Sequence, residues 1–147
     1  MIKLNSLMDM ADPKKQVFQI YFAGASLAFG LPFLIVEVIG IFIGAEILNQ
    51  FPETFGFLYV SLYVTGGLLG GALVARRVQI PEALRAGAIT GLMAYIFNQV
   101  IYVLFFGIEI IGDPYTLFAM VGGSFLGAFL MRQSRIKKEE EEKEEQG

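Results

Sequence analysis

The chain of 147 residues contains no cysteine and no histidine. Without cysteine it cannot form disulfides, use a thiol as a nucleophile or ligate an iron–sulfur cluster. Without histidine it lacks the commonest metal and haem ligand and the usual general base. The short motifs typical of serine hydrolases, zinc proteases and phosphate-binding loops are also missing. These absences predict a protein that is not an enzyme and binds no metal or cofactor.

Charged residues are scarce in the middle of the chain and gather near its ends and in one short internal stretch. The mean hydropathy is +0.60 and 55% of residues are hydrophobic, so little polar sequence remains to cover a soluble domain. The apolar runs between the charged stretches have the length that crosses a bilayer. The sequence predicts an all-α membrane protein that is surrounded by the lipid bilayer and has no nucleic-acid partner.

Four apolar runs predict four transmembrane helices within residues 17–132. Their expected ranges are 18–48, 57–75, 83–111 and 115–131. As one helix, the first run would measure roughly 45 Å against about 30 Å of hydrocarbon, so it must tilt, bend or protrude. Pro32 offers a bend, because it removes the hydrogen bond to the Ala28 carbonyl. Residues 112–114 are expected to form a tight turn before the fourth helix.

All eleven lysines and arginines fall on one side of the predicted membrane domain, whereas the charged residues of the other two loops are acidic. The positive-inside rule then predicts a multi-pass cell-membrane protein with both termini in the cytoplasm. Residues 1–16 are expected to form a cytoplasmic segment, with a short helix on the membrane surface as one alternative. Residues 133–147 form a charged cytoplasmic tail, read either as a solvated helical extension or as an acidic docking element.

The second half of the chain repeats the first. Gly66-Gly67 matches Gly122-Gly123, and Ala23-Gly24-Ala25 matches Ala86-Gly87-Ala88, without gaps inside either helix pair. Chance alignment of glycine-rich and alanine-rich helices is the alternative. Agreement across both pairs favours duplication. It predicts a four-transmembrane-helix bundle built from two repeated helical hairpins, related by a pseudo-twofold axis along the membrane normal.

Every predicted span carries small residues four positions apart. In lipid, helices associate through close backbone approach over such residues, because hydrophobicity cannot drive them together. Compact helix packing is therefore favoured over a glycine-lined pore. The glycines expected at helix contacts are Gly40, Gly44, Gly67, Gly71, Gly87, Gly91, Gly123 and Gly127.

Glu37 is expected in the packed interior, because seven-residue steps place it on one face of the first span with Gly30 and Gly44. The repeat alignment brings Asn98 and Gln99 to nearly the same depth. A carboxylate at that depth costs several kcal/mol unless it is protonated or paired. The cluster is interpreted either as hydrogen bonds that fix the packing or as a site for a monovalent cation or proton.

A hairpin pattern runs through Glu37, the Gly40/Gly44 pair, Leu48 with Asn49, the Gly67/Gly71 pair and Arg76. In these features residues 37–76 resemble the ATP synthase protein I family of small membrane proteins. The resemblance implies a helper in assembling a rotary ATPase ring, with cation handling. Asn49 stands where that family tends to have Asp, its usual loop proline is missing, and the hairpin is doubled here.

Two functions follow from these observations. The first is a non-enzymatic accessory, assembly or structural subunit that packs with copies of itself or with other membrane subunits. The second is a small cation or proton channel or transporter with its site at Glu37, Asn98 and Gln99. A hydrated route to Glu37 would favour the second, and a dry packed core the first. A lipid-modifying enzyme ranks third, because no nucleophile–base pair is visible.

Overall fold

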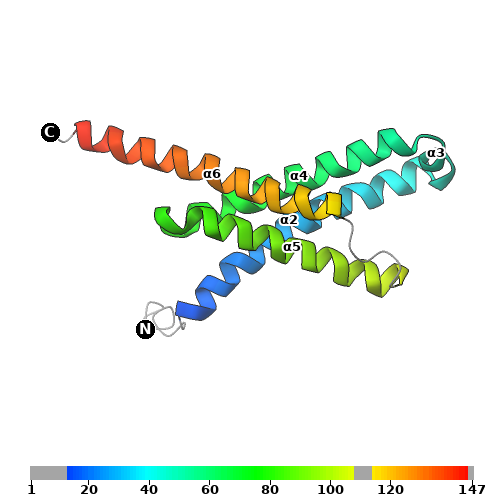
Figure 1. Ribbon diagram of the computed structural model, residues 1–147, viewed down its shortest axis with the longest axis horizontal. Helices are drawn as coiled ribbons and strands as arrows, with labels where there is room; N and C mark the ends of the chain where they lie inside the picture. The colour runs from blue at the N-terminus through cyan, green and yellow to red at the C-terminus, as the bar shows by residue number, and fades with distance from the viewer. Residues whose placement is uncertain (1–12, 108–113, 146–147) are drawn as a thin grey trace, which may run out of the picture.

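The structure, a computed structural model, describes residues 13–107 and 114–145. Its four long helices are α2 (Pro13–Ile43), α4 (Pro52–Arg77), α5 (Ala83–Phe106) and α6 (Pro114–Glu145). A short helix, α3 (Ala45–Gln50), joins α2 to α4, and a 3-10 turn (Ile80–Glu82) precedes α5. All four long helices are long and apolar enough to cross a membrane. The described chain is thus an all-α four-helix bundle, the fold of an integral membrane protein (Figure 1).

The first predicted span is divided, because α2 ends at Ile43 and α3 begins at Ala45. Gly44 between them has a φ of +79°, a left-handed conformation that glycine adopts at little steric cost and that ends an α-helix. The prediction of one helix over 18–48 is therefore wrong at its far end. The third span also ends earlier than predicted, at Phe106. Most of the turn expected at 112–114 lies outside the described residues.

Pro32 lies inside α2, and the helix continues through it. The Ala28 carbonyl, which the proline deprives of its usual partner, lies 2.5 Å from where a Cβ on Gly66 of α4 would be. The proline ring contacts the same position and is fully buried. The missing side chain of Gly66 thus makes room for both groups, and Pro32 becomes part of the contact between α2 and α4.

The helices α4 and α6 pack with their backbones in contact, because glycines of each lie directly against the other. The pairs are Gly67 with Met120, Gly71 with Ser124, Gly123 with Val64 and Gly127 with Leu68. The first and third pairs exchange under the shift of 56 residues that aligns Gly67 with Gly123, and so do the second and fourth. Reciprocal contacts of this kind are the pattern of two elements related by a twofold axis.

This relation does not extend to the other two helices. The face of α4 that carries Gly66 packs against α2, whereas the matching Gly122 of α6 is exposed and no atom lies within 4 Å of its added Cβ. The glycines of α5, Gly87 and Gly91, instead meet the side of α6 that carries Ser124. As a result α5 contacts α2, α4 and α6, while α2 packs mainly on α4 and α5.

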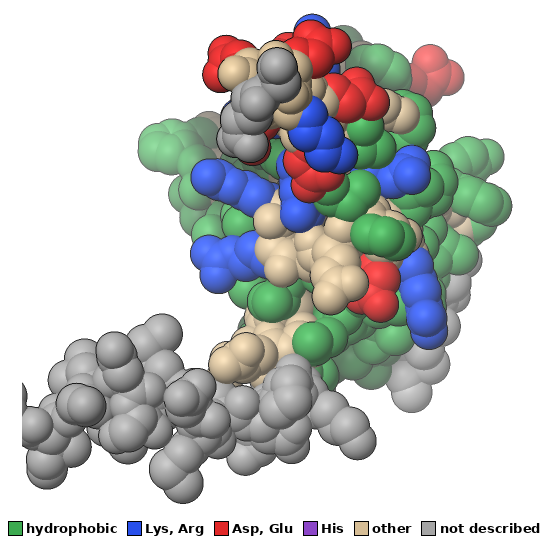
Figure 2. All heavy atoms as spheres, turned by 90° about the vertical axis from the view of Figure 1, so that its left-hand side faces the viewer, with side chains coloured by type: hydrophobic (Ala, Val, Ile, Leu, Met, Phe, Trp, Pro, Cys, Tyr) green, Lys and Arg blue, Asp and Glu red, His purple; other side chains and the backbone are tan. Residues whose placement is uncertain are grey.

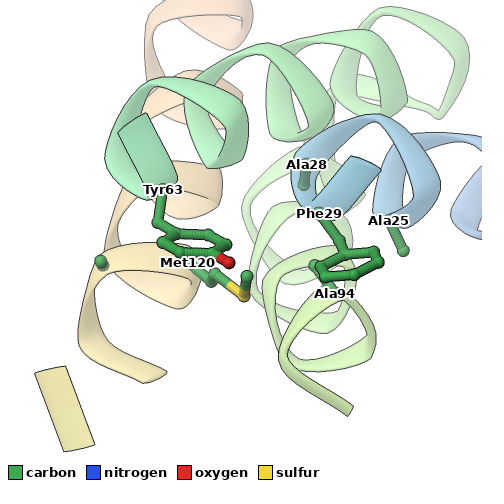
Figure 3. Close-up of a cluster of buried hydrophobic side chains, with 7 residues drawn as sticks. Ala25, Ala28, Phe29, Tyr63, Ala94 and Met120 are labelled. Carbon is green, nitrogen blue, oxygen red and sulfur yellow. The ribbon is translucent and has the colours of Figure 1, made fainter. Parts of the chain in front are cut away.

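The core lies where the four long helices meet. Figure 3 shows Phe29 of α2, Tyr63 of α4, Ala94 of α5 and Met120 of α6 turned toward one another. Most of the remaining buried residues are alanine or glycine, so the helices approach closely without large side chains between them. The described centre of the bundle is therefore filled by protein atoms.

Basic side chains gather at one end of the bundle, which we call the basic end (Figure 2). Arg76 and Arg77 close α4 there. The helix α6 continues past this end without interruption to Glu145, so the fourth span and the predicted tail are one helix (Figure 1). The opposite end, which holds α3, is called the α3 end.

Candidate functional site

The predicted cluster of Glu37, Asn98 and Gln99 is not assembled inside the chain. Asn98 is buried in the core with 4% of its surface exposed, and Gln99 beside it is half-buried. Glu37 is exposed on the outside of α2. The interior placement of Glu37 is thus corrected. It relied on a face shared with Gly30 and Gly44, and neither glycine has any atom within 4 Å of an added Cβ.

The partner of Asn98 is a tyrosine of α4 that no sequence motif or spacing marked as a site residue. The Tyr63 hydroxyl donates to Asn98 Oδ1 at 3.0 Å. It also lies 3.1 Å from the hydroxyl of Tyr59, which in turn hydrogen-bonds the hydroxyl of Tyr102. Four residues of α4 and α5 thus form one chain of hydrogen bonds, here called the tyrosine network. It joins the two helices on the α3 side of the packed core.

The tyrosine network reaches the surface through Tyr59. This residue lines a hollow of about 510 Å³ at the α3 end, between the first turns of α4 and α6. The other lining residues are Phe55, Gly56, Val60 and Tyr115. None of them is charged, and Tyr63 behind Tyr59 is fully buried. The arrangement holds a hydroxyl in place at the edge of an apolar hollow, and the lining residues that the structure describes include no carboxylate.

The eight candidate packing glycines fall into two groups. Gly67, Gly71, Gly123 and Gly127 lie in the contact between α4 and α6, and Gly87 and Gly91 lie against α6. Gly40 and Gly44 have no atom within 4 Å of an added Cβ, so among residues 13–107 and 114–145 they pack against no other helix. Spacing alone cannot separate the two groups, because it does not show which face of a helix meets a neighbour.

A second feature missed from the sequence lies at the basic end. One terminal nitrogen, Nη1 of Arg135, donates to the carbonyls of Ala75 and Val78 at 2.7 and 2.6 Å. Ala75 belongs to the last turn of α4, where backbone carbonyls lack partners within the helix, and Val78 is the residue that follows the helix. Arg135 of α6 therefore caps α4. The only sequence signal for this cap is the position of Arg135 after the fourth span, and that position equally suits a residue that contacts lipid headgroups.

The described residues contain no group of three or more acidic residues that could hold a metal ion. Comparison with protein-family models, with curated proteins and with solved structures finds no match. The fold and the site therefore define the class of protein, a small integral membrane bundle with a closed core.

Proposed function

We propose that the protein is a non-enzymatic accessory or assembly subunit that associates with other membrane-embedded helices through the face of α2 that carries Glu37. The observation that supports this is the position of Glu37 itself. Its carboxylate is exposed in an apolar span, six residues before α2 ends at Ile43. Its exposed neighbours on that helix are Leu34, Val38 and Ile41. A carboxylate facing lipid is costly, whereas one facing a polar group of a partner helix is not.

The packed core favours this proposal over a pathway for cations or protons within one chain. A pathway needs polar groups aligned along a hydrated route. Here Asn98 is held by Tyr63 in a core of apolar and small side chains, and Glu37 points away from that core. Six of the eight candidate glycines lie in contacts with a neighbouring helix, in α4, α5 and α6, so they line no open route. The accessory role therefore agrees better with the geometry than transport does.

Cross-linking in native membranes tests the proposal. Because the chain has no native cysteine, an introduced cysteine is its only thiol. We expect Val38→Cys, one residue from Glu37, to be joined to a second polypeptide by a short reagent that carries a thiol-reactive group and a photoreactive group, because the photoreactive group needs no particular side chain on the partner. The matched control is Leu104→Cys on α5, an equally apolar position that is 73% exposed. Adding Glu37→Gln should weaken the Val38→Cys cross-link while leaving the melting temperature of the purified chain unchanged, because exposed substitutions shift stability by less than about 0.5 kcal/mol.

Equal cross-linking from Val38→Cys and Leu104→Cys would show that the face of α2 has no preferred partner. A product with twice the mass of the chain that contains only its peptides would identify a homo-oligomer, and a product that contains peptides of another protein would identify another subunit. The resemblance of residues 37–76 to the ATP synthase protein I family makes a rotary ATPase the first heterologous complex to examine.

We also propose that the basic end and both termini face the cytoplasm. The basic side chains around one end support this orientation, since cytoplasmic segments are enriched in lysine and arginine (Figure 2). A membrane-impermeant thiol reagent added to intact cells should label Glu53→Cys, at the start of α4, but not Lys138→Cys. The reverse labelling pattern would invert the assignment.

A further inference from the structure

We propose that a groove between the start of α2 and the end of α4 binds an anionic phospholipid. The groove has a volume of about 450 Å³ and lies at the basic end, because Arg77 at the end of α4 lines it. Its lining residues are Gln16, Gln19, Ile20, Ala23, Leu73 and Arg77. None of these side chains is acidic, and one is an arginine, so the groove favours a negatively charged group.

The polar and apolar lining residues are separated along the membrane normal. The helices α2 and α4 run in opposite directions, and Gly24 lies against Gly70, which places Gln16 near the level of Arg77. One helical turn further into the span, about 5.4 Å, the lining becomes aliphatic on both helices, with Leu73 on α4. The groove is therefore polar at the end of the bundle and apolar toward its middle.

This order matches the order of groups in a phospholipid. A phosphodiester accepts charge-assisted hydrogen bonds from a guanidinium group and further hydrogen bonds from glutamine amides. An acyl chain contacts aliphatic side chains one turn deeper. Basic pockets between transmembrane helices bind anionic headgroups by this chemistry. The proposal requires only that the four helices cross a membrane, and it is independent of the accessory role.

Lipid retention by the full-length protein tests the polar part of the groove. The chain is purified in mild detergent, stripped of lipid, and incubated with equal amounts of dioleoylphosphatidylglycerol and dioleoylphosphatidylcholine. Native mass spectrometry then counts the bound lipids. The parent should retain the anionic lipid preferentially. Arg77→Gln should weaken this retention by about tenfold, because it removes both a nearby cation and a charge-assisted hydrogen bond.

The matched control is Arg76→Gln, which removes the same charge from an exposed neighbour outside the groove. It should weaken retention by less than about fivefold, the effect of one cation near an anionic headgroup. Equal losses in the two variants would mean that charge at the basic end attracts lipid without a defined site, and the proposal would be wrong.

The apolar part of the groove is tested by Leu73→Phe, which replaces an aliphatic side chain with a larger aromatic ring. It should lower retention of the anionic lipid at an unchanged melting temperature. Leu69→Phe, at an exposed position one turn away on α4, should not. Unchanged retention in Leu73→Phe would show that no acyl chain occupies the groove. Displacement of the lipid from the parent protein by millimolar inorganic phosphate would show that the groove binds phosphate alone. Either result would overturn the proposal.

Discussion

The helix α4 meets its neighbours α6 and α5 in two different ways. Against α6 its contact surface is backbone, because Gly67 and Gly71 lie directly on the other helix. Against α5 the contact described above is made by side chains, with the Tyr63 hydroxyl donating to Asn98. The first contact depends on side chains being absent, and the second depends on particular atoms being present. One helix thus combines steric packing on a parallel neighbour with hydrogen bonding to an antiparallel one.

The two contacts differ in what they contribute in lipid, where the hydrophobic effect does not drive helices together. Backbone contact gains dispersion over many atom pairs, and glycine has no side-chain rotamers to immobilise. A side-chain hydrogen bond between membrane helices contributes about 0.6 kcal/mol on average. Substitutions in the contact with α6 should therefore cost more than substitutions in the contact with α5.

The largest effect is expected for Gly71→Leu, because a side chain there would enter the backbone of Ser124. We expect a loss of more than about 3 kcal/mol, beyond the usual range for overpacking, since backbone cannot move aside as a side chain can. Thermal unfolding in detergent measures it, with Gly71→Ala as a milder variant if the leucine variant fails to fold. Gly122→Leu is the control, because its position is open. Equal stability of Gly71→Leu and Gly122→Leu would refute the contact between α4 and α6.

A smaller loss is expected for Arg135→Gln, which removes the cap that α6 places on the end of α4. Two charge-assisted hydrogen bonds to Ala75 and Val78 are lost. We expect about 1–2 kcal/mol, the lower part of the range for such bonds, because Arg135 is only half-buried. The same unfolding measurement applies, with Lys138→Gln as a control for the lost charge on an exposed part of α6. If the two variants lose equal stability, the cap contributes nothing beyond its charge.

The smallest of the three effects is expected for Tyr63→Phe, which deletes the central hydroxyl of the tyrosine network. Asn98 then lacks its donor in the core, at an expected cost of about 1 kcal/mol. Tyr95→Phe is the matched control on α5, outside the network. A Tyr63→Phe variant that loses as much stability as Gly71→Leu would reverse the ranking of the two contacts.

Hydropathy predicted the four helices well, because the length of an apolar run is a property of neighbouring residues. The far end of the first helix was missed, since it depends on the left-handed conformation of Gly44. The tyrosine network was missed for another reason. Tyr63 and Asn98 are 35 residues apart, and only the packing of α4 against α5 brings them together. Glu37 was misplaced because a seven-residue step defines a face without showing what that face meets.

The contact between α4 and α6 also sets an order of events during synthesis. Helices enter the membrane in chain order, and α5 separates these two partners in the sequence. From the insertion of α4 until α6 arrives, the glycine face of α4 has no cover from its own chain. A nascent protein therefore passes through a stage in which that face is open to any helix of suitable shape. The speed at which α5 and α6 follow decides how long mispairing competes with folding, and a chain truncated before Pro114 remains at that stage.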